Sequence, residues 1–148
     1  SLGLFYSSMT KRCGLVPQKD ESKLDDWGGY VDPIVKSLME RDFVFPHKWK
    51  PIFNINMHRG IGNWSPGFEP DEIAPAAQAV FEDMVMKISD YAQSKLPSKN
   101  LVLSGGCAFN KSIRPKLDEK WDNVYYPPNP GDAGSAETCV LAYLRNLQ

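Results

Sequence analysis

Apolar residues recur at helical spacing over one long stretch of the chain, from about Glu72 to Leu96. The positions that repeat every three or four residues are Ile73, Ala77, Val80, Phe81, Met84, Ile88, Tyr91 and Ala92. This spacing places one apolar stripe along a helix, so the pattern predicts the longest helix of the protein here. Pro75 falls near its beginning, and because proline fits a first helical turn, we expect Pro75 there or a start shifted by a few residues.

The first 70 residues carry weaker and more broken patterns. Residues 2–6 are apolar and fit either a helix or a buried strand, and a short helical pattern follows at 34–39. Residues 43–70 mix proline and glycine with aromatic residues, which excludes one long regular element. Short strands joined by turns are expected there, with 52–56 as the best strand candidate.

The last 50 residues alternate between two kinds of pattern. A short buried strand at 101–103 precedes a helix up to about Asp118, and a second strand at 124–126 precedes a helix from Gly131 to Leu144. Strand, helix, strand, helix indicates an α/β fold with a parallel or mixed sheet flanked by helices. Ligands of such folds bind beyond the carboxyl ends of the strands, and both of these strands run into glycine-rich loops.

The first of these loops is Ser104-Gly105-Gly106. Glycine lets a ligand approach the backbone and exposes amide donors near a helix start, where an anion or polar ring is favoured. The same residues also fit a tight turn from strand to helix. Ser104 is not expected to be a nucleophile, because the Gly-x-Ser-x-Gly elbow is absent and only His47 and His58 could serve as its base.

The second loop, Gly131-Asp132-Ala133-Gly134, opens the final helix. Aspartate is a preferred helix N-cap, so Asp132 could simply start this helix. A carboxylate at a strand end can equally bind a hard cation or a transition metal. The spacing alone supports both interpretations.

Composition narrows the class of partner. The 148 residues include 42% hydrophobic and 24% charged residues with a formal net charge of -1, which fits one globular domain over 1–148 and provides no field for nucleic acid or an anionic membrane. No apolar run approaches the ~20 residues that span a bilayer. Three scattered cysteines, Cys13, Cys107 and Cys139, are expected to be reduced thiols in a cytoplasmic protein.

Taken in order, these motifs resemble the nodulation-type and antibiotic O-carbamoyltransferases, whose amino-terminal domain is similar to the tRNA threonylcarbamoyladenosine enzyme. The residues that carry the resemblance are Ser1-Leu2-Gly3-Leu4-Phe5-Tyr6-Ser7, Cys13-Gly14-Leu15, Glu21-Ser22-Lys23, the pair Ala74 and Gln78, the run from Leu101 to Asn110, and Gly131 to Ala136. The resemblance is good over 1–24 and 71–146. Residues 25–70 carry no motif of the family, so the acceptor is not readable from them.

The resemblance implies the actin and Hsp70-like (ribonuclease H-like) ATPase fold, with this chain as its second, nucleotide-binding half. By resemblance, Gly105, Gly106 and Asn110 contact the adenosine or its α-phosphate of bound ATP, and Gly131 and Gly134 belong to the same cofactor-binding set. Asp132 is implied as one ligand of a divalent metal, iron in the family. The other metal ligands of the family pattern, a His-x-x-x-His segment and an aspartate, have no match in this chain, and no catalytic residue is assigned.

The implied reaction uses carbamoyl phosphate and ATP to make a carbamoyl-adenylate, whose carbamoyl group then passes to an acceptor hydroxyl. We expect this chain to be inactive alone and to require a missing amino-terminal half or another copy of itself. Three alternatives remain: a relative of the tRNA-modifying enzyme, a kinase or chaperone of the same fold, and a non-catalytic nucleotide-binding or assembly module. The Gly-Asp-Ala-Gly run at 131–134 favours the carbamoyltransferase branch.

Overall fold

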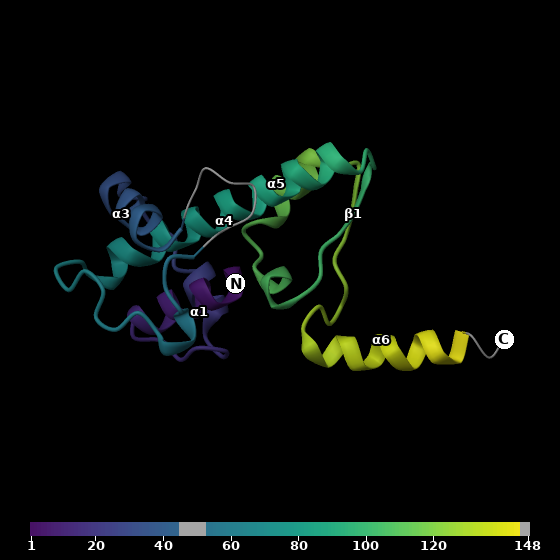
Figure 1. The fold of residues 1–148 in the computed structure, drawn as a ribbon, viewed down its shortest axis with the longest axis horizontal. Helices are drawn as coiled ribbons and strands as arrows, with labels where there is room; N and C mark the ends of the chain where they lie inside the picture. The colour runs from purple at the N-terminus through teal and green to yellow at the C-terminus, as the bar shows by residue number, and fades with distance from the viewer. Residues whose placement is uncertain (45–52, 146–148) are drawn as a thin grey trace. The chain divides into compact units, whose positions relative to one another are not determined.

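The computed structural model describes residues 1–44 and 53–145, which form two compact units: unit 1, residues 1–97, and unit 2, residues 98–148 (Figure 1). Unit 1 is helical, and unit 2 contains a small parallel sheet with helices. The predicted α/β class is therefore confirmed. The half of an actin-like ATPase fold and the single domain over 1–148 stay predictions.

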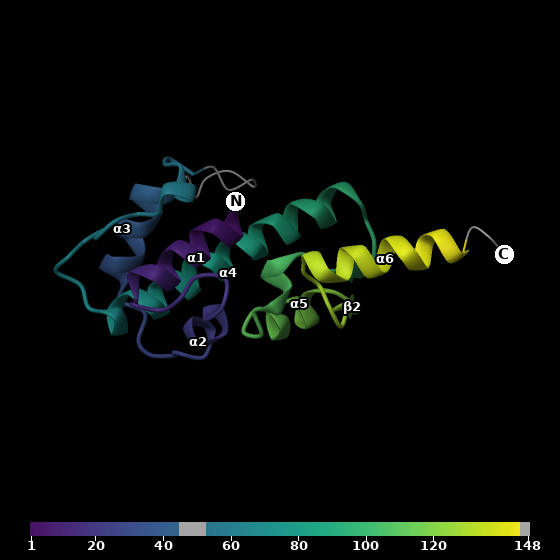
Figure 2. The same ribbon diagram turned by 90° about the horizontal axis from the view of Figure 1, so that it is seen from below.

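Unit 1 is organised around α4 (Pro70–Lys95), on which α1 (Leu2–Arg12), α2 (Glu21–Asp25) and α3 (Pro33–Phe43) pack. Figures 1 and 2 both show α1 and α3 lying along α4. Side chains from these helices form the core, and the larger apolar ones with no exposed surface are Phe5, Met9, Val35, Met39, Ile73, Val80 and Met84. The helical interpretation of residues 2–6 is correct, and Ser1 Oγ accepts the Leu4 N–H at 3.3 Å to cap α1.

The start of α4 differs from the prediction made from Pro75. The helix begins at Pro70, where proline fits the first position, and the Glu69 N–H donates to Glu72 Oε2 at 2.9 Å. Pro75 therefore lies in the second turn, not the first, and the expectation for it is wrong. Its ring is buried beside Gly29, where an added Cβ would come within 3.1 Å of it.

The strands expected between 43 and 70 do not form in the described part of that stretch. It contains one isolated antiparallel bridge, Val44 to Phe53, and the 3₁₀-helix η1 (Met57–Arg59). Residues 45–52, which include His47 and the first residue of the candidate strand at 52–56, lie outside the described residues. Residues 64–68 are held by a side chain instead of by strand pairing. The guanidinium of Arg12 donates to the carbonyl oxygens of Trp64, Ser65 and Phe68 at 2.7, 3.0 and 2.8 Å.

Unit 2 has the predicted order of strand, helix, strand, helix. Strand β1 (Asn100–Val102) pairs in parallel with β2 (Asn123–Tyr125), Leu101 opposite Val124, and the crossover holds the 3₁₀-helix η2 (Gly106–Phe109) and α5 (Arg114–Lys120). The final helix is α6 (Asp132–Arg145). The sheet of the described residues is thus a two-stranded parallel pair, smaller than the mixed sheet that the family resemblance implies.

Within the described ranges, every helix is too short or too polar to cross a bilayer. Cytoplasmic location stays a prediction.

Replacing Phe5 by alanine should lower the free energy of unfolding by ~3–5 kcal/mol, because the ring is fully buried and lies 6.2 Å from that of Phe53 and 6.4 Å from that of Phe43. The matched control is Ile34→Ala on α3, whose side chain is 65% exposed and should change stability by less than ~0.5 kcal/mol. Urea unfolding followed by circular dichroism measures both. Equal losses in the two variants would contradict the core described here.

Candidate functional site

The two glycine-rich loops of unit 2 lie side by side at the carboxyl ends of the paired strands. Beyond the strand ends, the Leu103 N–H donates to the Tyr125 carbonyl at 3.1 Å, and the Gly105 N–H donates to the Pro130 carbonyl at 2.7 Å. The Phe109 ring lies against Gly131, where an added Cβ would stand 3.1 Å from a ring carbon. Loop residues 104–110 and 130–134 therefore form one continuous edge, which we call the loop edge.

Gly105 and Gly106 are both exposed on the loop edge but differ in backbone geometry. Gly105 has φ 90°, a conformation that side-chain-bearing residues rarely adopt, and its amide is used by Pro130. Gly106 has no such constraint, and a Cβ built on it meets no atom within 4 Å. Gly105 thus shapes the loop, whereas Gly106 leaves open space for a ligand.

Asn110 and Gly134 are buried, in contrast to the two exposed glycines. The Asn110 side chain is 8% exposed, and its Oδ1 accepts the Ile113 N–H at 3.2 Å, which fixes the chain just before α5. Gly134 packs so closely on the preceding loop that an added Cβ would overlap the carbonyl oxygen of Asn129. The hydrogen bond of Asn110 and the close packing of Gly134 explain these residue types without a ligand. Their contact with a nucleotide stays a prediction.

Asp132 is the first residue of α6 and is exposed. Its carboxylate makes no hydrogen bond or ion pair to any other residue that the structure describes. The N-cap interpretation therefore finds no support in the described contacts, and the carboxylate is available to a cation. The described residues contain no group of three or more His, Cys, Asp or Glu side chains that could hold a metal ion, and a metal at Asp132 stays a prediction.

Arg114 contacts both the loop edge and Tyr126, which the sequence alone did not indicate. Arg114 donates from Nη2 to the Ala108 carbonyl at 3.3 Å, and its guanidinium lies 4.7 Å from the centroid of the Tyr126 ring. The Tyr126 hydroxyl lies 2.8 Å from Asp118 Oδ1, and burial together with this carboxylate raises the pKa of Tyr126 to about 12. No spacing in the sequence links these residues, because α5 and β2 bring them together only after folding.

In unit 1, the motif residues that carried the family resemblance contact one another. The Tyr6 hydroxyl donates to Gln78 Oε1 at 2.6 Å, and Gln78 donates in turn to Glu82 at 2.7 Å. The Ser7 hydroxyl donates to Glu21 Oε1 at 2.6 Å. Tyr6 thus joins α1 to α4, and Ser7 joins α1 to α2.

The family described as "Carbamoyltransferase N-terminus" matches residues 1–140. The chain belongs to this family.

Three relatives are similar to this chain, and in each the match covers only part of a longer protein. An uncharacterised protein of Methanocaldococcus jannaschii is 27% identical over 96% of this chain and 30% of its own length, and one of Synechocystis is 28% identical over 99% of this chain and 28% of its own. The tRNA N6-adenosine threonylcarbamoyltransferase of Streptococcus pneumoniae is 34% identical over half of this chain and 23% of its own length. The chain thus spans less than a third of each of these relatives.

Gly134→Ala should destabilise the protein by ~1–3 kcal/mol, because the added methyl group overlaps the Asn129 carbonyl and the loop must shift. This loss opposes the gain of ~1 kcal/mol that alanine normally brings to a helix. The control is Gly106→Ala, which enters open space and should stay within ~0.5 kcal/mol of the wild type. Urea unfolding of both variants tests this, and a stabilised Gly134→Ala protein would contradict the close approach.

Proposed function

We propose that this chain is the nucleotide- and metal-binding part of an ATP-dependent O-carbamoyltransferase, which transfers a carbamoyl group through carbamoyl-adenylate to an acceptor hydroxyl. The observation that carries this proposal is the loop edge: two glycine-rich loops joined at the carboxyl ends of parallel strands, in a chain of the carbamoyltransferase family. Open α/β sheets bind their ligands at this edge.

Each exposed residue of the loop edge has a chemical task in this proposal. Gly106 lets the nucleotide approach the backbone, and the N-terminal turn of α6 places its positive dipole end where phosphate oxygens are favoured. Phe109 is 56% exposed beside Gly131 and offers an aromatic face to the base. These groups position the reactants and stabilise charge on the phosphate and carbamoyl oxygens.

Asp132 is the residue of this chain that would hold the metal, proposed to be iron or a similar divalent ion. An exposed carboxylate without a described partner fits such a cation. The bound metal would act as a Lewis acid on a phosphate or carbamoyl oxygen. The described residues contain no group of three or more His, Cys, Asp or Glu side chains that could hold the ion, so its other ligands would include groups from outside them, such as phosphate oxygens or water.

The surface of unit 2 supports the proposal that the active enzyme needs more polypeptide. Apart from Gly134, the α6 residues whose side chains are described are exposed, and the large apolar ones among them are Val140, Leu141, Tyr143 and Leu144. A helix of 14 residues is marginal without packing, and parallel sheets are normally covered on both faces. We propose that an amino-terminal half, or a second copy of the chain, covers these surfaces and that this chain is inactive alone.

A second candidate is a threonylcarbamoyl transfer role like that named for the pneumococcal relative, which is 34% identical over half of this chain. The family match over residues 1–140 and the net charge of -1 favour the O-carbamoyl reaction. Binding of tRNA to this chain at physiological salt would favour the second candidate.

Calorimetric titration of ATP, with and without Fe²⁺ under anaerobic conditions, tests the proposal. We expect Fe²⁺ to strengthen ATP binding, Gly106→Val to weaken binding at least about tenfold by filling the ligand space, and Asp132→Ala to abolish the Fe²⁺ effect. Gly106 has ordinary backbone angles and open surroundings, so valine should leave the fold intact.

Glu137→Ala is the matched control for Asp132→Ala, because Glu137 is an exposed carboxylate on the same helix. It should leave both ATP affinity and the Fe²⁺ effect unchanged. ATP binding that neither Gly106→Val nor Asp132→Ala alters would contradict the assignment of the loop edge as the nucleotide site.

A further inference from the structure

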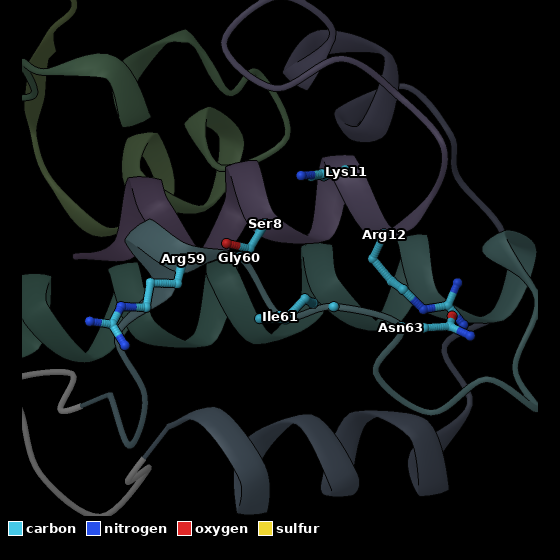
Figure 3. A pocket seen from close by; sticks show the side chains of 8 residues that line it. Ser8, Lys11, Arg12, Arg59, Gly60, Ile61 and Asn63 are labelled. Carbon is cyan, nitrogen blue, oxygen red and sulfur yellow. The ribbon is translucent and has the colours of Figure 1, made fainter.

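Unit 1 contains a pocket of about 330 Å³ between the carboxyl-terminal half of α1 and residues 59–63. Figure 3 shows Ser8 and Lys11 on α1 on one side of this segment, with Arg59 and Arg12 extending to its two ends. The pocket lies entirely within unit 1 and takes no residue from the loop edge. Its residues 59–63 belong to the stretch in which the sequence carries no family motif, whereas Ser8, Lys11 and Arg12 lie within residues 1–24, where the resemblance is good.

The lining of the pocket is cationic. Lys11, Arg12 and Arg59 contribute three positive charges, and no carboxylate is among the lining residues. Unit 1 as a whole contains more acidic than basic residues, so this concentration is local. Within the ranges that the structure describes, the side chains of Lys11 and Arg59 make no hydrogen bond or ion pair. Their charges are therefore free to act on an anion that enters the pocket.

Arg12 differs from the other two cations because its guanidinium is already fixed. Its three hydrogen bonds to the carbonyls of residues 64, 65 and 68 fix the position of its guanidinium at one side of the pocket. Since carbonyl oxygens carry no formal charge, these bonds position the arginine without neutralising it. The pocket thus combines one preorganised positive charge with two that can adjust to a ligand.

The opposite wall is the 59–63 segment, in which two glycines separate Arg59, Ile61 and Asn63. Gly60 and Gly62 have φ 74° and 58°, angles that favour glycine, and a Cβ on either would meet no atom within 4 Å. Glycine at these two positions therefore lets the 59–63 segment follow its path beside α1 and leaves open space at both. Ser8 adds a hydroxyl, which lies 3.5 Å from the Met57 carbonyl.

We propose that this pocket binds a phosphate-type anion, the diphosphate group of a small phosphorylated ligand. From Ser8 to Arg12 the helix rises ~6 Å, about the length of a diphosphate, and the volume lies at the lower end of that of small-molecule pockets. Flexible and fixed cations together suit the several oxygens of such a group. The site is separate from the loop edge and does not depend on the proposed carbamoyl transfer.

Titration of inorganic pyrophosphate into the complete chain, by calorimetry at low ionic strength, tests this site. We expect one binding event that Lys11→Gln combined with Arg59→Gln weakens at least about tenfold. Both residues are exposed, so circular dichroism should show an unchanged fold. Arg12 is left in place, because its loss would also release the loop at 64–68.

Two controls make the result specific. Lys95→Gln removes a positive charge on α4 that lies on the order of 25 Å along the helix from Gln78, which α1 contacts, and it should change the affinity less than about twofold. Gly106→Val separates this site from the loop edge, and pyrophosphate binding should persist in that variant.

Three results would overturn the proposal. They are the absence of pyrophosphate binding, an equal loss in the Lys95→Gln protein, and a loss confined to Gly106→Val, which would place the anion at the loop edge instead. Failure of the ATP experiment leaves the pyrophosphate result unaffected, because the two sets of variants share no charged residue.

Discussion

The parallel pairing of β1 with β2 is the interaction on which the candidate site depends. Each strand has only three residues, yet their parallel direction places both carboxyl ends at one edge. The bonds from Leu103 to Tyr125 and from Gly105 to Pro130 extend the pairing into the loops. So short a ladder is weak by itself, and the contacts of Arg114 with Ala108 and Tyr126 reinforce it from the side of α5.

Many of the motif residues serve the scaffold, not a ligand. Tyr6 is bonded to Gln78, Ser7 to Glu21, and Asn110 to the backbone before α5. Gly106 and Asp132 differ from these residues. Both are exposed; a Cβ built on Gly106 meets no atom within 4 Å, and the Asp132 carboxylate has no partner among the described residues. In this chain, the printed contacts of these motif residues therefore hold helices and loops together.

What the sequence could predict follows the range of the interactions involved. The long helix and the strand–helix alternation depend on local periodicity, and both glycine-rich loops were placed correctly at strand ends. The path of residues 64–68 depends on Arg12, more than 50 positions away. The position of Pro75 depends on space left by Gly29. The Arg114 and Tyr126 pair likewise forms only through tertiary packing, so no pattern along the chain could show it.

The three carbonyls bound by Arg12 have a consequence for how this protein can change over evolutionary time. A guanidinium that binds only main-chain oxygens is indifferent to the side chains of the segment it holds, apart from the backbone path they allow. As far as Arg12 is concerned, Ser65 and Phe68 can therefore vary in side chain while their course stays fixed, whereas Trp64 is also held by the hydrogen bond from its Nε1 to Asp42 Oδ2 at 3.0 Å. Such an arrangement lets a surface acquire new specificities without rebuilding the fold beneath it.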